Sequence, residues 1–128
     1  MDCGVPVNPN LCRIQVEGGS VQGIGMALFE QARFDGSGRL RNNSFLNYKI
    51  PCREDLGQLT VAFADGQEPT GPFGAKSLGE VVINPPAPAI LNAIFDATGV
   101  RFRSLPVTPE DMLMALLEDS DDGDKQSG

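Results

Sequence analysis

The sequence predicts one α+β unit in which short mixed strands accompany two or three helices. Three observations lead to this prediction. Apolar residues recur at helical spacing in three segments, short runs of alternating apolar and small residues lie between them, and turn-forming residues separate the two kinds of segment. With 128 residues, the chain is long enough for a single domain with one hydrophobic core.

The composition excludes several classes of protein. A hydrophobic fraction of 41% and a charged fraction of 21% are ordinary for a globular domain, and no apolar run approaches the ~20 residues that cross a bilayer. The chain opens without the basic and apolar stretches of a secretory signal, so we expect a cytoplasmic protein without a membrane partner. The net charge of -7 and the scattered lysines and arginines disfavour nucleic acid as a partner.

Three cysteines, Cys3, Cys12 and Cys52, are irregularly spaced, and the chain has no histidine. Zinc and iron-sulfur sites are typically built from Cys or Cys/His sets with regular spacing, which this sequence lacks. We therefore expect free thiols and no metal ligated by this chain's own side chains.

The N-terminal part is predicted to be an extended segment followed by a helix. Residues 1–9 should end an extended segment that turns at Asn8 and Pro9. Because a strand that starts at the first residue has no room for its own entry, we expect the chain to be cut from, or encoded apart from, a longer partner. Helical apolar spacing over residues 11–29 predicts a helix despite four glycines. Each glycine costs roughly 1 kcal/mol relative to alanine, usually compensated by close approach of a backbone or ligand.

The middle of the chain is predicted to contain short strands and an ordered loop. Residues 30–34 and 39–41 flank the turn formers at 35–38, which predicts a hairpin. Residues 59–64 alternate apolar and small side chains, as a short strand does. Residues 68–79 contain two prolines and three glycines and are predicted to form an ordered loop.

A helix and a short strand are predicted next. The helix, residues 89–97, follows a proline cluster and stops before Gly99, a residue that favours the left-handed conformation at helix ends. Residues 101–105 are the predicted strand.

The last predicted helix begins at Thr108, a good N-cap, with Pro109 in the first helical position. Residues 118–128 include four aspartates and no apolar residue, and we expect them to form a disordered acidic tail because they cannot repay their ordering entropy. The domain is therefore predicted to be residues 1–117. Its last helix contributes Met112, Leu113, Leu116 and Leu117 to the core.

Two segments have compositions that ordinary secondary structure does not explain. The first is Q-V-E-G-G-S-V-Q-G-I-G at residues 15–25, and the second is E-P-T-G-P-F-G-A-K-S-L-G-E at residues 68–80. Neither satisfies the phosphate-binding P-loop pattern or G-x-G-x-x-G. Their glycines must serve another purpose.

These segments belong to an ordered set of six that covers residues 2–116. The set resembles the C-terminal part of the molybdopterin-binding subunit in the xanthine dehydrogenase and aldehyde oxidase family of molybdenum hydroxylases. Subunits of that family are several times longer, so the resemblance implies that another chain completes the molybdopterin-binding domain. The six segments are D-C-G-V-P-V-N-P, Q-V-E-G-G-S-V-Q-G-I-G, Y-K-I-P, E-P-T-G-P-F-G-A-K-S-L-G-E, A-P-A-I-L-N-A-I-F-D-A-T-G-V-R and L-P-V-T-P-E.

The resemblance implies hydroxylation of an N-heterocycle such as a purine, or oxidation of an aldehyde, by a Mo-bound hydroxyl. The implied cofactor is molybdopterin, either as such or as its cytosine dinucleotide. Electrons would leave through 2Fe-2S clusters to FAD. The implied partners are the remaining part of the molybdenum-binding subunit and the iron-sulfur and FAD subunits.

The resemblance also assigns roles to residues of this chain. Glu80 matches the family's catalytic base, which must reach within ~3 Å of the hydroxyl whose proton it takes. The stretch Lys76, Ser77, Leu78 and Gly79 matches residues that contact the pterin. The polar side chains of Gln15 and Asn8 match further positions beside the cofactor, where amides can pair with pterin donors and acceptors.

Simpler interpretations of these residues remain open. Glu80 could merely place a negative charge at a helix N-terminus, Lys76 could be a solvated surface charge, and Gln15 could lie on the polar face of a helix. Two hypotheses follow for the chain. It is either a component of a molybdenum hydroxylase, inactive alone, or a non-catalytic fragment that only folds or binds a partner.

Overall fold

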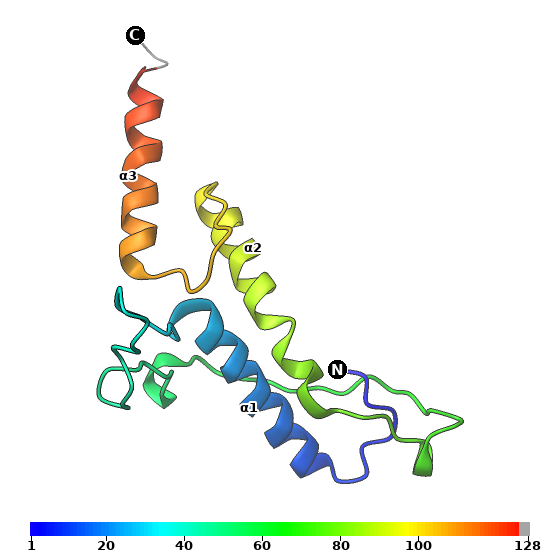
Figure 1. The fold of residues 1–128 in the computed structure, drawn as a ribbon. Helices are drawn as coiled ribbons and strands as arrows, with labels where there is room; N and C mark the ends of the chain where they lie inside the picture. Colours follow the sequence, from blue (N-terminus) through cyan, green and yellow to red (C-terminus); the bar gives the residue numbers. More distant parts are fainter. Residues whose placement is uncertain (126–128) are drawn as a thin grey trace.

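A computed structural model describes residues 1–125, with side-chain environments through Glu118. The described chain is helical, with long irregular connections (Figure 1). Its three α-helices are α1 (Pro9–Leu28), α2 (Pro86–Thr98) and α3 (Pro109–Lys125), and its three short 3-10 helices are η1 (Arg53–Asp55), η2 (Pro72–Gly74) and η3 (Gly79–Ile83).

The α+β prediction is wrong, because the described residues contain only two isolated β-bridges and no strand. One bridge joins Phe34 to Leu40 in the predicted hairpin, whose turn forms but whose arms do not continue as a ladder. The segments 59–64 and 101–105 were expected to be strands, yet neither forms a ladder. The first is bonded to the start of the chain, where Ala64 N donates to Met1 O at 2.8 Å and Met1 N donates to Ala62 O at 3.2 Å, but this pairing does not continue. Alternation in sequence marks an extended chain, whereas a strand also needs a partner.

Helix α1 confirms the helix predicted at residues 11–29, beginning two residues earlier. The side-chain oxygen of Asn8 accepts a hydrogen bond from Leu11 N at 3.1 Å, which makes Asn8 the N-cap, and Pro9 takes the first helical position. The helix ends where Phe29 N donates to Gly25 O at 2.9 Å.

The glycines of α1 let two other elements approach closely. A Cβ on Gly19 would overlap the side chain of Val82 in η3, which is 1% exposed. A Cβ on Gly23 would lie 2.8 Å from both the Ile83 carbonyl oxygen and the Pro86 ring. The predicted reason for these glycines, close approach of another backbone, is therefore met by η3 and the start of α2.

Helix α2 confirms the helix predicted at 89–97, with its start three residues earlier at Pro86. It stops at Gly99, whose φ of 75° is left-handed as expected. In Figure 1, α2 runs beside α1.

Helix α3 begins as predicted, with reciprocal hydrogen bonds between Thr108 and Asp111. It stands apart from α1 and α2 (Figure 1) and continues to Lys125, through most of the segment predicted to be a disordered tail. Residues 126–128 of that segment lie outside the described residues, and a domain boundary at residue 117 stays a prediction.

The core is small for a chain of this size. The solvent-accessible surface of the chain is 9386 Å², whereas a compact monomer of 13.6 kDa exposes about 6,600 Å². Among the described residues, no helix is long and apolar enough to cross a membrane. In the part of the chain that the structure describes, the buried hydrophobic side chains are Cys3, Ala27, Val82 and Val107, and Pro51 and Pro106 are buried too.

Substitution of Gly19 should test the packing of α1 against η3. In the protein that contains this chain, Gly19→Ala should lower the melting temperature, since overpacking typically costs ~1–3 kcal/mol and Val82 has little room to shift. Gly36→Ala is the matched control, because a Cβ at Gly36 meets nothing within 4 Å. Equal melting temperatures for the two variants would contradict the packing described above.

Candidate functional site

The segment 76–80 is fixed in place by the first residues of the chain. Gly4 forms an isolated antiparallel bridge with Ala75, Lys76 N donates to Cys3 O at 2.7 Å, and Val5 N donates to Gly74 O at 2.9 Å. Gly4 has a φ of 62°, and a Cβ there would overlap the Gly74 carbonyl oxygen. Two independent features therefore require glycine at this position: the left-handed backbone conformation and the close contact with Gly74.

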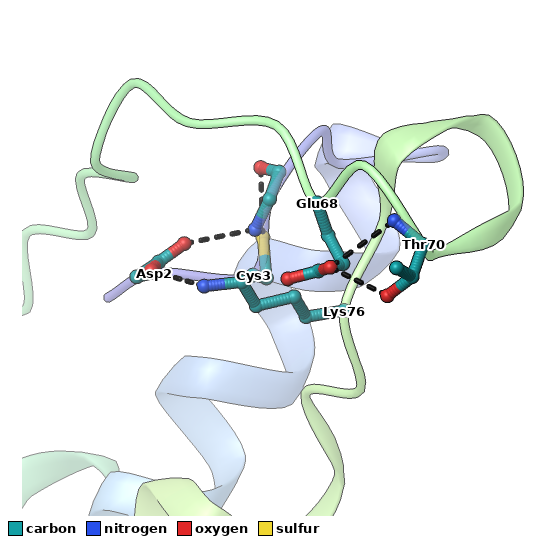
Figure 2. A network of polar contacts seen from close by, with 6 residues as sticks. Asp2, Cys3, Glu68, Thr70 and Lys76 are labelled. Carbon is teal, nitrogen blue, oxygen red and sulfur yellow. Dashed lines mark hydrogen bonds and ion pairs between the residues drawn. The ribbon is translucent and has the colours of Figure 1, made fainter.

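The ammonium group of Lys76 pairs with the carboxylate of Asp2. Figure 2 shows the two side chains turned toward each other, with Nζ 2.7 Å from Oδ2. The hydrogen bond from Lys76, with a second from Gly4 N, holds the pKa of Asp2 below its usual value, and the same pair raises the pKa of Lys76. Both side chains are partly exposed, so the pair is oriented but open to solvent.

The loop before Lys76 is ordered by its own hydrogen bonds, as predicted for residues 68–79. Glu68 accepts bonds from Thr70 N at 3.1 Å and Thr70 Oγ1 at 2.6 Å (Figure 2). The Thr70 hydroxyl is the main reason that the pKa of Glu68 is lowered. Glu68 N also donates to Gly74 O at 2.9 Å, which closes the loop around η2.

Helix α1 holds the same segment from a second side. Gln15 Nε2 donates to the carbonyl oxygen of Gly79 at 2.8 Å, so two residues that the sequence assigned to one site are in contact. The backbone N–H groups of Ser77 and Leu78 donate no hydrogen bond to any residue that the structure describes. The segment is therefore held at the Lys76 amide and the Gly79 carbonyl, while the amides of Ser77 and Leu78 have no partner among the described residues.

Glu80 lies in the first turn of η3, directly after Gly79, whose φ is 35°. Its side chain is exposed and has no hydrogen-bond or ion-pair partner among the described residues. Lys76, Ser77, Leu78, Gly79, Glu80 and Gln15 are thus brought together, with the carboxylate open to whatever lies outside this chain.

Asn8 lies at the other end of the candidate site. Seven residues separate it from Gln15, which corresponds to about 10 Å along a helix and to nearly the same face. Its side-chain oxygen is used in capping α1, which leaves the amide nitrogen for any other contact. Its role at the cofactor stays a prediction.

The sequence did not identify Asp2 as part of this arrangement. Asp2 and Lys76 are 74 positions apart, and no local pattern indicates their contact. The three cysteines are free, with Cys3 buried beneath the segment and Cys52 exposed. Among the described side chains, no group of three or more His, Cys, Asp or Glu is arranged to hold a metal ion.

Sequence comparison finds relatives over most of the chain. The family model described as Molybdopterin cofactor-binding domain matches residues 1–57. A putative xanthine dehydrogenase molybdenum-binding subunit from Escherichia coli is 49% identical over 110 residues, which are 85% of this chain and 15% of the relative.

Structural comparison agrees. Quinoline 2-oxidoreductase from Pseudomonas putida matches 91% of this chain with a TM-score of 0.83 and 28% identity, over 15% of its own length. The aldehyde oxidoreductase from Desulfovibrio desulfuricans matches 89% with a TM-score of 0.79 and 32% identity, over 12% of its length. The chain thus spans only a small part of the proteins that it matches.

The Asp2–Lys76 pair predicts a measurable titration. In NMR-detected titrations, Asp2 should have a pKa below that of a free aspartate, and Lys76→Met should raise it part of the way back, since the bond from Gly4 N remains. Glu68→Gln, which leaves the pair intact, is the control. An Asp2 pKa unchanged by Lys76→Met would show that the pair does not form.

The sign of the pH dependence follows from the two shifts. The contribution of Asp2 to stability is present above its unfolded pKa and lost as the pH falls through its lowered folded value. The contribution of Lys76 is present below its unfolded pKa and lost as the pH rises through its raised folded value. The wild-type protein should therefore exceed Lys76→Met in stability by the largest amount at pH values between the pKa of Asp2 and the pKa of Lys76.

Proposed function

The chain belongs to the family of molybdenum-binding subunits of xanthine dehydrogenases and aldehyde oxidoreductases, and on that premise we propose that it supplies the catalytic base of a molybdenum hydroxylase. The cofactor that this family binds is molybdopterin. We propose Glu80 as the base, and Asn8, Gln15, Lys76, Ser77, Leu78 and Gly79 as residues at the cofactor.

The observation that carries the proposal is the way segment 76–80 is held. Gln15 binds the Gly79 carbonyl and Cys3 binds the Lys76 amide, so the backbone is fixed by contacts within the chain. The amides of Ser77 and Leu78 stay available as donors. A rigid backbone with available donors suits the pterin, which carries both hydrogen-bond acceptors and donors around its rings.

The donor set also suits the cofactor chemically. When bound, molybdopterin supplies the redox centre and a water-derived oxygen for the substrate. The Glu80 carboxylate would accept a proton there, and its position at the end of the held segment would fix where that proton is taken. Gly79 carries no side chain between the carboxylate and the segment that precedes it.

The substrate class and the partners extend the same proposal. Relatives act, by their names, on xanthine, quinoline and aldehydes, which supports an N-heterocycle or an aldehyde as substrate here. Because the chain spans 15% of its relative from Escherichia coli, we propose that the rest of a molybdenum-binding subunit completes the pocket. The 2Fe-2S clusters and FAD belong to partner chains or domains, and the chain alone is inactive.

A non-catalytic fragment is the competing candidate, favoured by the exposure of Glu80 and by the small core. Purification of this chain together with its neighbouring gene products separates the two. We expect a complex that contains this chain and about one molybdenum per complex, measured by elemental analysis. A monomer without metal or partner would identify the fragment instead.

The base assignment is tested by Glu80→Gln in the complete enzyme. The amide keeps the size of the side chain but cannot accept the proton, so kcat should fall by about 10²–10⁴-fold while molybdenum content stays at the wild-type level. Glu110→Gln, an exposed acid in the first turn of α3, is the matched control and should keep its kcat. Near-normal turnover in Glu80→Gln would remove Glu80 from the role.

A further inference from the structure

A groove runs between α1 and the segment that follows η1. Its volume is about 420 Å³, and it lies on a part of α1 distinct from the Gln15 contact with Gly79. Apolar side chains from both walls line it, with one charged residue of each sign among them. The lining includes Ile14, Val21, Leu56, Leu59, Glu17 and Arg53.

Two glycines on opposite walls of this groove have no explanation within the chain. Gly18 lies in the middle of α1, and a Cβ there would meet nothing within 4 Å; the same holds for Gly57 on the other wall. Gly19, Gly23 and Gly25, by contrast, all have neighbours that a Cβ would touch. An exposed glycine inside a helix costs roughly 1 kcal/mol relative to alanine, so Gly18 indicates a contact outside this chain.

The apolar surface continues from the groove toward the start of α1. Within α1, Leu11 and Ile14 are three positions apart, hence on one face, and are 62% and 59% exposed. Exposed apolar residues that adjoin an apolar groove indicate an interaction site.

We propose that the groove receives a main-chain segment from the rest of the molybdenum-binding subunit, with its backbone against Gly18 and Gly57 and its apolar side chains between Ile14 and Leu59. The identity of the partner rests on the proposed function. Two observations select this occupant: the chain spans 15% of its relative's length, and its surface exceeds that of a compact monomer by over a third. Glycines on both walls suit a backbone, since they remove the side chains that would hold it away.

Thiol accessibility in the complete molybdenum-binding subunit tests the proposal. Gly18→Cys introduces a small side chain into open space, and its alkylation by iodoacetamide is followed by peptide mass spectrometry. Gly36→Cys, at another position with open space, is the matched control. We expect the Gly18→Cys thiol to be alkylated several-fold more slowly than the control thiol. Equal rates, together with full oxidation of Ile14 and Leu59 in hydroxyl-radical footprinting of the unaltered subunit, would overturn the proposal.

Two further arms distinguish other occupants. Protection that appears only when molybdopterin is loaded identifies the cofactor as occupant, and protection that rises with protein concentration identifies a second copy; either result overturns the proposal. Hydroxyl-radical footprinting of the unaltered subunit measures the exposure of Ile14 and Leu59 directly, and it also covers the case in which Gly18→Cys does not assemble. Both side chains should be protected, and full oxidation at both sites would overturn the proposal.

The docking proposal and the proposed function can fail independently of each other. A protected thiol in a subunit that binds no molybdenum would leave the docking inference standing and remove the catalytic one. An active, unaltered enzyme in which Ile14 and Leu59 are fully oxidised would do the reverse.

Discussion

The arrangement of this chain depends on the contact between the glycine face of α1 and the η3–α2 junction. Gly19 leaves room for the Val82 side chain, and Gly23 leaves room for the Ile83 carbonyl and the Pro86 ring, so the two segments pack closely. Since η3 begins at Gly79, this contact also determines where Glu80 lies. Gln15, one turn before Gly19 on the same helix, then reaches the Gly79 carbonyl without any further adjustment. The packing contact and the candidate site are therefore built from one helix.

The two sides of segment 76–80 differ in how well they are satisfied. On one side, α1 and residues 3–5 supply hydrogen-bond partners, and Cys3 and Val82 are buried. The amides of Ser77 and Leu78 and the carboxylate of Glu80, by contrast, have no hydrogen-bond partner among the described residues, and Ser77 and Glu80 are exposed. In water, such donors can bond to solvent. When a ligand or a neighbouring polypeptide covers them, they can bond to it instead. The exposure of Glu80 is thus consistent with a half-site that another chain completes.

Local signals were sufficient to predict the three α-helices, although α1 and α2 begin two and three residues earlier than expected and α3 continues into the predicted tail. Thr108 as the cap, Pro109 as the start and Gly99 as the terminator were predicted from a few residues each, whereas Asn8 and Pro9, predicted to end an extended segment, instead cap and start α1. The strand predictions were wrong because a strand needs a hydrogen-bonded partner elsewhere in the chain. The alternation of residues 59–64 carries no information about such a partner. The Asp2–Lys76 pair, 74 positions apart, was missed for the same reason. Gly18 and Gly19 are neighbours in sequence, yet only three-dimensional packing shows that one is enclosed and the other open.

The Asp2–Lys76 pair also bears on how this chain could contact a phosphate-bearing cofactor. A phosphate that used the Lys76 ammonium would have to compete with a carboxylate 2.7 Å away, at a site where solvent already screens the charge. The amides of Ser77 and Leu78 face no such competitor. Backbone donors also do not depend on which side chain a residue carries. We therefore expect the main chain of residues 77–78, more than the charge of Lys76, to provide this chain's hydrogen bonds to the cofactor.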